Sequence, residues 1–351
     1  MANVAQPEFY IWMLQLPNKL LVQNKYYTSD FQYCFPNYFC TANMNVYKDI
    51  NSLPVFNKAV ITTGSFDGVH LGHAQIISQL INEAKRINGT PVLITFYPHP
   101  KQIVQIKDKP LFVLNTPEEK YELLQKMGIE NIVVVPFDKE FSELSAKKYI
   151  DDFLVKKFNP SLIVVGYDHR FGNNREGDFN LLKNEGINNN YEVIEIPEHI
   201  LKDITISSTK IRTALFSGQT DTAAAYLGYN YFFSGIVMEG NKLGRTIGYP
   251  TANLNIANEN KLIPGNGVYA VDIFINKRFY KGMMNIGNRP TVNGKEKTIE
   301  VNIFNFNEDI YGEEIKIILK KFLRYEIKFQ GLEMLTAQLK IDESQSKIFN
   351  V

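Results

Sequence analysis

Residues 58–86 read KAVITTGSFDGVHLGHAQIISQLINEAKR. The pattern of residues 58–63 predicts a short apolar strand, and the apolar residues of 74–86 recur with the spacing of one helix face. Between them, three glycines allow a tight turn and the close approach of a ligand to the backbone. A strand that turns through glycines into a helix indicates the beginning of a parallel βα sheet.

The same alternation continues to about residue 165. Further strands are predicted at 91–96, 131–136 and 162–165, and helices at 118–127 and 146–158. Thr116 and Pro117 precede the first of these helices as its N-cap and its first-position proline. Uninterrupted apolar strands separated by helices indicate a parallel sheet that is covered on both faces.

The pattern changes after about residue 228. Strand-like segments with turn residues between them follow at 231–238, 267–275, 278–286, 298–306 and 314–322, before a helical segment at 331–341. Short strands of this kind predict an antiparallel barrel. We therefore expect α/β plus all-β: a Rossmann-like parallel-sheet domain over residues 44–228, then a Greek-key β-barrel with a terminal helix over residues 229–351.

The overall composition is that of a globular protein of two ordinary domains. The 351 residues are 44% hydrophobic and 21% charged, with a formal net charge of +1. This charge gives no reason to expect nucleic acid or an anionic membrane as a partner, and no stretch approaches the roughly 20 apolar residues of a membrane span. Both cysteines, Cys34 and Cys40, lie near the start, so a disulfide framework, a thiolate nucleophile and a cysteine zinc site are excluded for the main body. We expect a cytoplasmic enzyme.

Residues 1–43 differ from the rest of the chain. They are rich in Tyr and Phe, include the single tryptophan, Trp12, and show neither the strand period nor the helix period. We expect a poorly ordered tail or a start-site artefact. An arm that binds a partner is the alternative, and only the aromatic content favours it.

The glycine loop at 64–73 carries chemistry as well as a turn. The helix that follows points its N-terminal N–H groups at this space, which is a natural phosphate site. His70 and His73 are three residues apart, so both rings can face one phosphate and donate hydrogen bonds to charge that develops on a bridging oxygen. An ordinary turn with two surface histidines is the alternative. The sequence contains no G-x-x-x-x-G-K-[ST], so the loop is not a Walker loop.

Two later segments are predicted near the same edge of the sheet. Residues 166–172, GYDHRFG, follow the strand at 162–165, which places Asp168 where open α/β sheets bind ligands. Residues 206–212, ISSTKIR, bring hydroxyl groups to the start of a helix, with Lys210 and Arg212 beyond them. Alone, this second segment could be an ordinary N-cap.

Together these motifs resemble the H-x-G-H and I-S-S-T-x-I-R signatures of bacterial FAD synthetases, within the nucleotidyltransferase superfamily. The resemblance implies transfer of a nucleotidyl group from ATP with release of pyrophosphate, and it implies catalytic roles for His70, His73 and Arg212. It further implies that the residues that bind ATP or its phosphates are Gly64, Phe66, Asp67, Gly72, Asp168, Ser207, Ser208 and Thr209. His169 stands where many relatives carry phenylalanine.

A second motif, GRTIGYPTAN at 244–253, lies in the predicted barrel. Thr251 and Asn253 are two residues apart, so in an extended segment their side-chain oxygens face the same side. Mg²⁺ needs few protein oxygens when a triphosphate supplies the rest. Lys242 and Arg245 add positive charge to the glycine-rich flap. A surface hairpin is the alternative.

Residues 298–303, TIEVNI, alternate between apolar and polar side chains. The alternation places Glu300 on the polar face, opposite Ile299 and Val301. An exposed glutamate of a strand usually does no more than keep the surface soluble. A carboxylate within hydrogen-bond reach of a hydroxyl could instead take its proton as the oxygen attacks the γ-phosphate of ATP.

These barrel segments resemble the riboflavin kinase module, whose P-T-A-N motif matches residues 250–253. The resemblance implies that Thr251 and Asn253 hold Mg-ATP and that Glu300 is the base for the flavin hydroxyl. Further ATP-binding residues would be Lys242, Gly244, Arg245 and Gly248. Arg324 and Glu326 would contact the flavin, although Tyr325 stands where aspartate or proline is common.

Over residues 44–351 the sequence resembles the bifunctional bacterial riboflavin kinase/FMN adenylyltransferase. The resemblance implies that riboflavin and ATP give FMN and ADP in the barrel, and that FMN and ATP give FAD and pyrophosphate in the N-terminal domain, with Mg²⁺ as the cation. One alternative is an adenylyltransferase for another phosphorylated small molecule, which the P-T-A-N barrel argues against. The other is a non-catalytic flavin or nucleotide sensor, which the intact His70, His73 and Glu300 argue against. The oligomeric state is not predicted.

Overall fold

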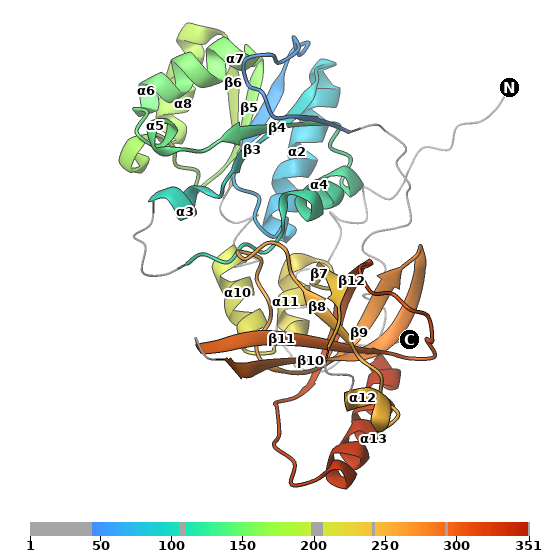
Figure 1. The fold of residues 1–351 in the computed structure, drawn as a ribbon. Helices are drawn as coiled ribbons and strands as arrows, with labels where there is room; N and C mark the ends of the chain where they lie inside the picture. The colour runs from blue at the N-terminus through green and yellow to red at the C-terminus, as the bar shows by residue number, and fades with distance from the viewer. Residues whose placement is uncertain (1–43, 105–109, 198–205, 241–242, 292–293, 350–351) are drawn as a thin grey trace, which may run out of the picture. The chain divides into compact units, whose positions relative to one another are not determined.

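A six-stranded parallel sheet forms the N-terminal domain (Figure 1). The computed structural model describes residues 44–104, 110–197, 206–240, 243–291 and 294–349. The sheet's strands are β1 (Asn45–Tyr47), β2 (Val60–Thr63), β3 (Pro91–Tyr97), β4 (Asn131–Pro136), β5 (Leu162–Gly166) and β6 (Glu192–Ile196). They lie in the order β1-β4-β3-β2-β5-β6, and every pair is parallel. The predicted parallel sheet is confirmed, with two edge strands, β1 and β6, that the sequence pattern did not indicate.

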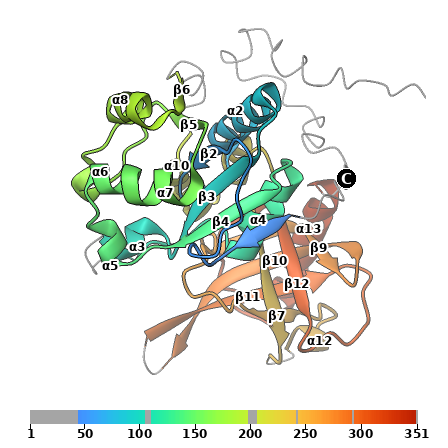
Figure 2. The same ribbon diagram turned by 90° about the horizontal axis from the view of Figure 1, so that it is seen from above.

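Helices cover both faces of this sheet (Figure 2). One face packs against α2 (Leu71–Ile87) and α4 (Pro117–Lys126), and the other packs against a helical stretch at 146–158 and α8 (Phe179–Asn189). The stretch at 146–158 comprises α6 (Ala146–Lys148), the π-helix η2 (Tyr149–Val155) and α7 (Lys156–Phe158). The shorter helices of the domain are α3 (Pro100–Val104), α5 (Lys139–Ser142) and η3 (Asn173–Arg175).

The C-terminal part is a closed antiparallel barrel with strand order β10-β11-β8-β7-β12-β9. Its strands are β7 (Phe232–Met238), β8 (Ala252–Asn255), β9 (Gly267–Ile275), β10 (Arg278–Thr291), β11 (Gly294–Ile303) and β12 (Glu314–Arg324). A short helix, α12 (Leu243–Thr246), lies in the segment before β8, and α13 (Leu332–Phe349) ends the described chain. The predicted barrel with a terminal helix is confirmed.

Two helices, α10 (Ser208–Phe216) and α11 (Thr220–Leu227), lie against the barrel (Figure 1). Ile211, Leu215 and Leu227 are fully buried in the same apolar cluster as the barrel interior. The helix that carries the I-S-S-T-x-I-R motif therefore shares its core with the barrel. This packing ties one wall of the first predicted site to the second domain.

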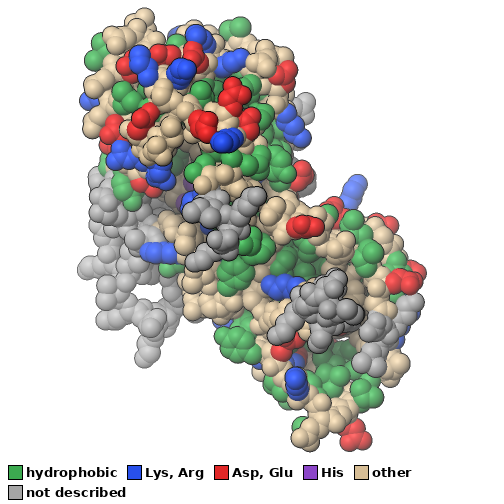
Figure 3. Space-filling view, turned by 60° about the vertical axis from the view of Figure 1, so that its left-hand side comes forward, with side chains coloured by type: hydrophobic (Ala, Val, Ile, Leu, Met, Phe, Trp, Pro, Cys, Tyr) green, Lys and Arg blue, Asp and Glu red, His purple; other side chains and the backbone are tan. Residues whose placement is uncertain are grey.

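Where described residues are visible in Figure 3, Lys and Arg side chains are intermingled with Asp and Glu. Among the helices that the structure describes, none combines the length and the apolar character needed to cross a membrane.

Candidate active sites

The loop at 64–73 joins β2 to α2 and bends sharply. Phe66 and Val69 are buried and have positive φ angles of 47° and 36°, and Gly68 has a φ of 87°. A Cβ on Gly68 would lie 2.6 Å from the Leu114 side chain, so this position requires glycine. Strained backbone of this kind persists only where the surrounding packing holds it, and it is typical of functional sites.

The two predicted histidines lie face to face at the start of α2. Their ring centroids are 3.7 Å apart and the ring planes differ by 13°. His70 is the N-cap of the helix, and its Nδ1 accepts a hydrogen bond from the His73 N–H at 3.4 Å. Because Nδ1 is the acceptor, the proton of a neutral His70 ring is on Nε2, which remains available as a donor.

Burial holds both imidazoles in the neutral form at pH 7. Loss of hydration lowers the pKa of His70 to about 4, and the neighbouring Asp67 only partly opposes this. The pKa of His73 lies well below its usual value, first because of desolvation and then because of His70 and Lys120. The pair can therefore donate hydrogen bonds without carrying charge.

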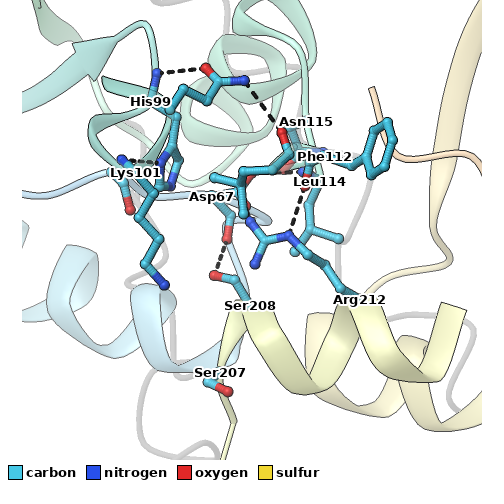
Figure 4. A network of polar contacts seen from close by, with 12 residues as sticks. Asp67, His99, Lys101, Phe112, Leu114, Asn115, Ser207, Ser208 and Arg212 are labelled. Carbon is cyan, nitrogen blue, oxygen red and sulfur yellow. Dashed lines mark hydrogen bonds and ion pairs between the residues drawn. The ribbon is translucent and has the colours of Figure 1, made fainter. Parts of the chain in front are cut away.

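Arg212 and Asp67 form a buried ion pair between α10 and the glycine loop (Figure 4). The other oxygen of Asp67 accepts the Leu114 N–H at 2.8 Å, and Arg212 Nε donates to the Phe112 carbonyl oxygen at 2.7 Å. The Ser208 hydroxyl donates to the Asp67 carbonyl oxygen at 2.9 Å. The structure thus brings the I-S-S-T-x-I-R helix into contact with the H-x-G-H loop.

The remaining residues of the first prediction lie at the start of α10 and in the turn after β5. Ser207 is the N-cap of α10, where its hydroxyl accepts the Lys210 N–H, and Thr209 is exposed on the first turn. Asp168 is exposed in the turn after β5. Since β5 pairs in parallel with β2, this turn and the glycine loop leave the sheet at the same edge. His169 stacks on Phe171 with ring centroids 5.8 Å apart.

Sequence reasoning missed Lys120, a buried lysine of α4. Its Nζ donates to the Ser65 carbonyl oxygen at 2.8 Å and to Thr95 Oγ1 at 3.3 Å. No carboxylate of the described residues lies within ion-pair distance of it, and burial lowers its pKa to about 8. A lysine on a helix with charged neighbours is usually exposed, so no local sequence pattern indicated that Lys120 is buried.

In the barrel, three polar side chains line up across neighbouring strands. Asn285 of β10 pairs with Glu300 of β11, and Glu300 pairs with Asn253 of β8. Paired residues share a face of the sheet, and Ile299 and Val301 on either side of Glu300 are buried in the barrel interior. Glu300 and Asn253 therefore lie side by side on the outer face.

The P-T-A-N segment is held over this row by Asn302, a second residue that the sequence reasoning missed. Asn302 is 7% exposed, and its side-chain amide donates to the Pro250 carbonyl oxygen at 2.7 Å. A Cβ on Gly240 would lie 2.0 Å from Asn253 Nδ2, so the asparagine side chain rests against bare backbone. Asn253 also lines a pocket of about 600 Å³ together with Met238 and Thr298.

Three of the other predicted kinase residues, Gly244, Arg245 and Gly248, lie among the described residues. Gly248 has a φ of 82°, a Cβ on Gly244 would lie 2.1 Å from the Tyr249 carbonyl oxygen, and Arg245 donates to the Tyr311 hydroxyl at 3.4 Å. Lys242 lies outside the described residues.

The two residues predicted to contact the flavin, Arg324 and Glu326, have different partners. Arg324 pairs with the buried Asp342 of α13 at 2.6 Å, so its guanidinium anchors the terminal helix. Glu326 lies over Gly287 in β10, where a Cβ would be 2.4 Å from its Oε1, and this places its carboxylate beside Asn285. The flavin-binding role of both residues remains a prediction.

Comparisons with known proteins match both domains. A family model described as FAD synthetase matches residues 53–210, and one described as riboflavin kinase matches residues 227–349. The bifunctional riboflavin kinase/FMN adenylyltransferase of Buchnera aphidicola subsp. Schizaphis graminum is 40% identical over 316 residues, which cover 88% of this chain and 100% of that protein. This chain belongs to the bifunctional riboflavin kinase/FMN adenylyltransferase family.

Two further relatives span most of the chain. The Escherichia coli K12 member of the family is 36% identical over 291 residues, 83% of this chain and 92% of that protein. A crystal structure described as a macrolide-efflux protein from Streptococcus pneumoniae is 33% identical with a TM-score of 0.79, covering 87% of this chain and 98% of that one. The chain is thus an enzyme of flavin cofactor biosynthesis with both activities, and its substrates are the small molecules ATP, riboflavin and FMN.

The buried histidines predict a specific loss of stability in acid. Because the folded pKa of His70 is about 4 and the unfolded value is about 6.5, the unfolded chain takes up a proton first as the pH falls. This one group should lower the free energy of unfolding by about 2 kcal/mol between pH 7 and pH 5. Chemical denaturation followed by circular dichroism at the two pH values measures the change.

The matched variant is His70→Asn, since asparagine keeps an N-cap oxygen for the His73 N–H. Its loss of stability between pH 7 and pH 5 should be smaller than that of the natural chain by the same amount. Equal losses in the two proteins would contradict the neutral, buried state of His70.

Proposed function

We propose that the two reactions occur at the two sites described above. In the barrel, the 5′-hydroxyl of riboflavin attacks the γ-phosphate of ATP, which gives FMN and ADP. At the glycine loop, the phosphate of FMN attacks the α-phosphate of ATP, which gives FAD and pyrophosphate. The observation that carries the assignment is the pairing of Glu300 with Asn253 on the outer face of a barrel whose chain also holds the stacked His70–His73 pair.

For adenylyl transfer, the protein supplies donors and one cation. Negative charge increases on the oxygen that leaves with pyrophosphate, and hydrogen bonds from His70 and His73 at the N-terminus of α2 would stabilise it there. Arg212 is already paired with Asp67, so we assign the uncompensated positive charge to Lys120. A buried amine without a carboxylate partner is stabilised by a phosphate that binds beside it.

For phosphorylation, Glu300 is placed as the base. Its carboxylate is half-buried, so it can accept the hydroxyl proton while water remains excluded from part of the site. Asn302 has a positioning role, because its hydrogen bond to the Pro250 carbonyl oxygen sets where Thr251 and Asn253 lie relative to Glu300. No covalent enzyme intermediate is required, and positioning supplies much of the rate enhancement.

Magnesium is part of the proposal for the barrel site. The described residues contain no group of three His, Cys, Asp or Glu side chains that could hold a metal ion by themselves. Thr251 and Asn253 offer neutral oxygens instead, and the Asn253 amide lies in space that Gly240 leaves open. These two residues would hold the ion together with the phosphates of ATP, and the ion would neutralise charge on those phosphates.

A cytoplasmic location stays part of the proposal, because both reactions consume ATP. Residues 1–43 lie outside the described residues, so the expectation of a tail or of a partner-binding arm remains a prediction, as do the domain limits at 44–228 and 229–351.

The assignment of Glu300 is tested by incubating the purified full-length protein with riboflavin, ATP and Mg²⁺ and separating the flavins by chromatography. The natural chain should form FMN and then FAD. Glu300→Gln should lower FMN formation by at least about 100-fold because the base is lost, while FMN supplied directly is still converted to FAD. Loss of both conversions in a folded variant would rule out separate sites.

The role of Lys120 is tested by its charge. Lys120→Met should lower kcat/KM for ATP in FAD formation about 100-fold, the usual effect of removing one donor to developing charge. In the natural chain, kcat/KM for FAD formation should fall as the pH rises through about 8, because the lysine then loses its proton.

The riboflavin kinase reaction of the same preparations is the control, and it should change less than about twofold. An unchanged FAD-forming rate in Lys120→Met, or the same alkaline decline in that variant, would sink the assignment.

A further inference from the structure

Lys261 is a barrel lysine that is buried against the N-terminal domain. Its side chain is 1% exposed and lies in the segment between β8 and β9. Nζ donates to the Leu114 carbonyl oxygen at 2.6 Å, to Glu119 Oε2 at 2.5 Å and to the Phe232 carbonyl oxygen at 3.0 Å. An ammonium group has three protons, so all of them are used. Two of the three acceptors belong to the N-terminal domain.

The backbone around Lys261 reinforces this contact. The Val113 N–H donates to the Asn260 carbonyl oxygen at 2.7 Å, and the Leu262 N–H donates to the Val113 carbonyl oxygen at 2.9 Å. Val113 and Lys261 form a short parallel bridge. The barrel therefore holds the segment at 112–114 in the way that a sheet holds an added strand.

The opposite edge of that segment contacts the adenylyl-transfer site. The Leu114 residue that gives its carbonyl to Lys261 gives its N–H to Asp67, and Asp67 pairs with Arg212 (Figure 4). The Leu114 side chain also packs where a Cβ on Gly68 would lie. Direct contacts therefore connect the barrel lysine to the strained turn of the glycine loop through one residue.

Glu119 provides a second connection between Lys261 and the glycine-loop site. Its carboxylate accepts the Thr116 N–H at 2.9 Å within the capping box of α4, and the same oxygen binds Lys261. The cap fixes the first turn of the helix. Lys120, which follows Glu119, is thereby held with its amine on the Ser65 carbonyl oxygen.

We propose that Lys261 is a positioning residue for adenylyl transfer, through which the kinase barrel fixes the geometry of the FMN adenylyltransferase site. The proposal rests on the function proposed above. Without Lys261, the Leu114 carbonyl loses its donor, and the Glu119 carboxylate loses its cationic partner and keeps the Thr116 N–H. The glycine loop and Lys120 then lose the support that sets their distance from each other, while the row of Asn253 and Glu300 keeps its strand pairing.

The test is Lys261→Met in the full-length chain, with Lys316→Met as the matched control. Lys316 also reaches from the barrel to α4, where its Nζ lies 2.6 Å from Glu122 Oε2, and the other ion-pair partner of Glu122 among the described residues is Lys126 of the same helix. Lys261→Met should lower kcat for conversion of FMN to FAD at least about tenfold, because small displacements of reacting groups are costly. Phosphorylation of riboflavin in the same preparation, and both activities of Lys316→Met, should stay within about twofold.

A double variant separates positioning from stability. Lys261→Met with Glu119→Gln leaves no unpaired buried charge, so its unfolding midpoint should return toward that of the natural chain. Its kcat for FAD formation should remain low, because the Leu114 carbonyl still has no donor. Recovery of that kcat, or an equal fall of both activities in Lys261→Met, would overturn the proposal. Absence of FAD formation by the natural chain would instead overturn the proposed function and this proposal with it.

Discussion

A single buried carboxylate, Asp67, organises the glycine-loop site, where we propose that adenylyl transfer occurs. It is 1% exposed, and a charge at that depth is tolerated only when it is paired and fully hydrogen-bonded. One oxygen meets Arg212 of α10 and the other meets the Leu114 N–H, so three segments that are distant in sequence must come together for the fold to bear this charge. Removal of Arg212 or of Asp67 would leave the other charge unpaired. The same contacts therefore stabilise both the site and the local fold.

The two sites rely on different electrostatics. At the glycine loop, burial keeps His70 and His73 neutral and lowers the pKa of Lys120, so the site is arranged for donating hydrogen bonds to phosphate. In the barrel, Glu300 is half-buried beside neutral amides, an arrangement suited to accepting a proton. The proposed order of the reactions matches this division, because the product of the barrel is the phosphate that the loop receives.

The sequence alone predicted the features that depend on local pattern. Strand and helix periods indicated both domains, and the spacing of His70 and His73, the spacing of Thr251 and Asn253 and the alternation around Glu300 led to the two predicted sites. It did not indicate the buried lysines, since Lys261 and Glu119 are 142 positions apart and no local pattern reports such a contact. The helix α11 was missed because eight residues, five of them alanine or threonine, carry little periodic signal.

The segment at 112–114 is held from both sides, by Asn260–Leu262 of the barrel and by Asp67 of the glycine loop. Native-state hydrogen exchange of the Val113 and Leu114 amides tests it most directly, because one is bonded to the barrel and the other to the loop. Both amides should exchange as slowly as those of the core strands β2 and β9. Exchange of either amide at the rate of an exposed loop would contradict it.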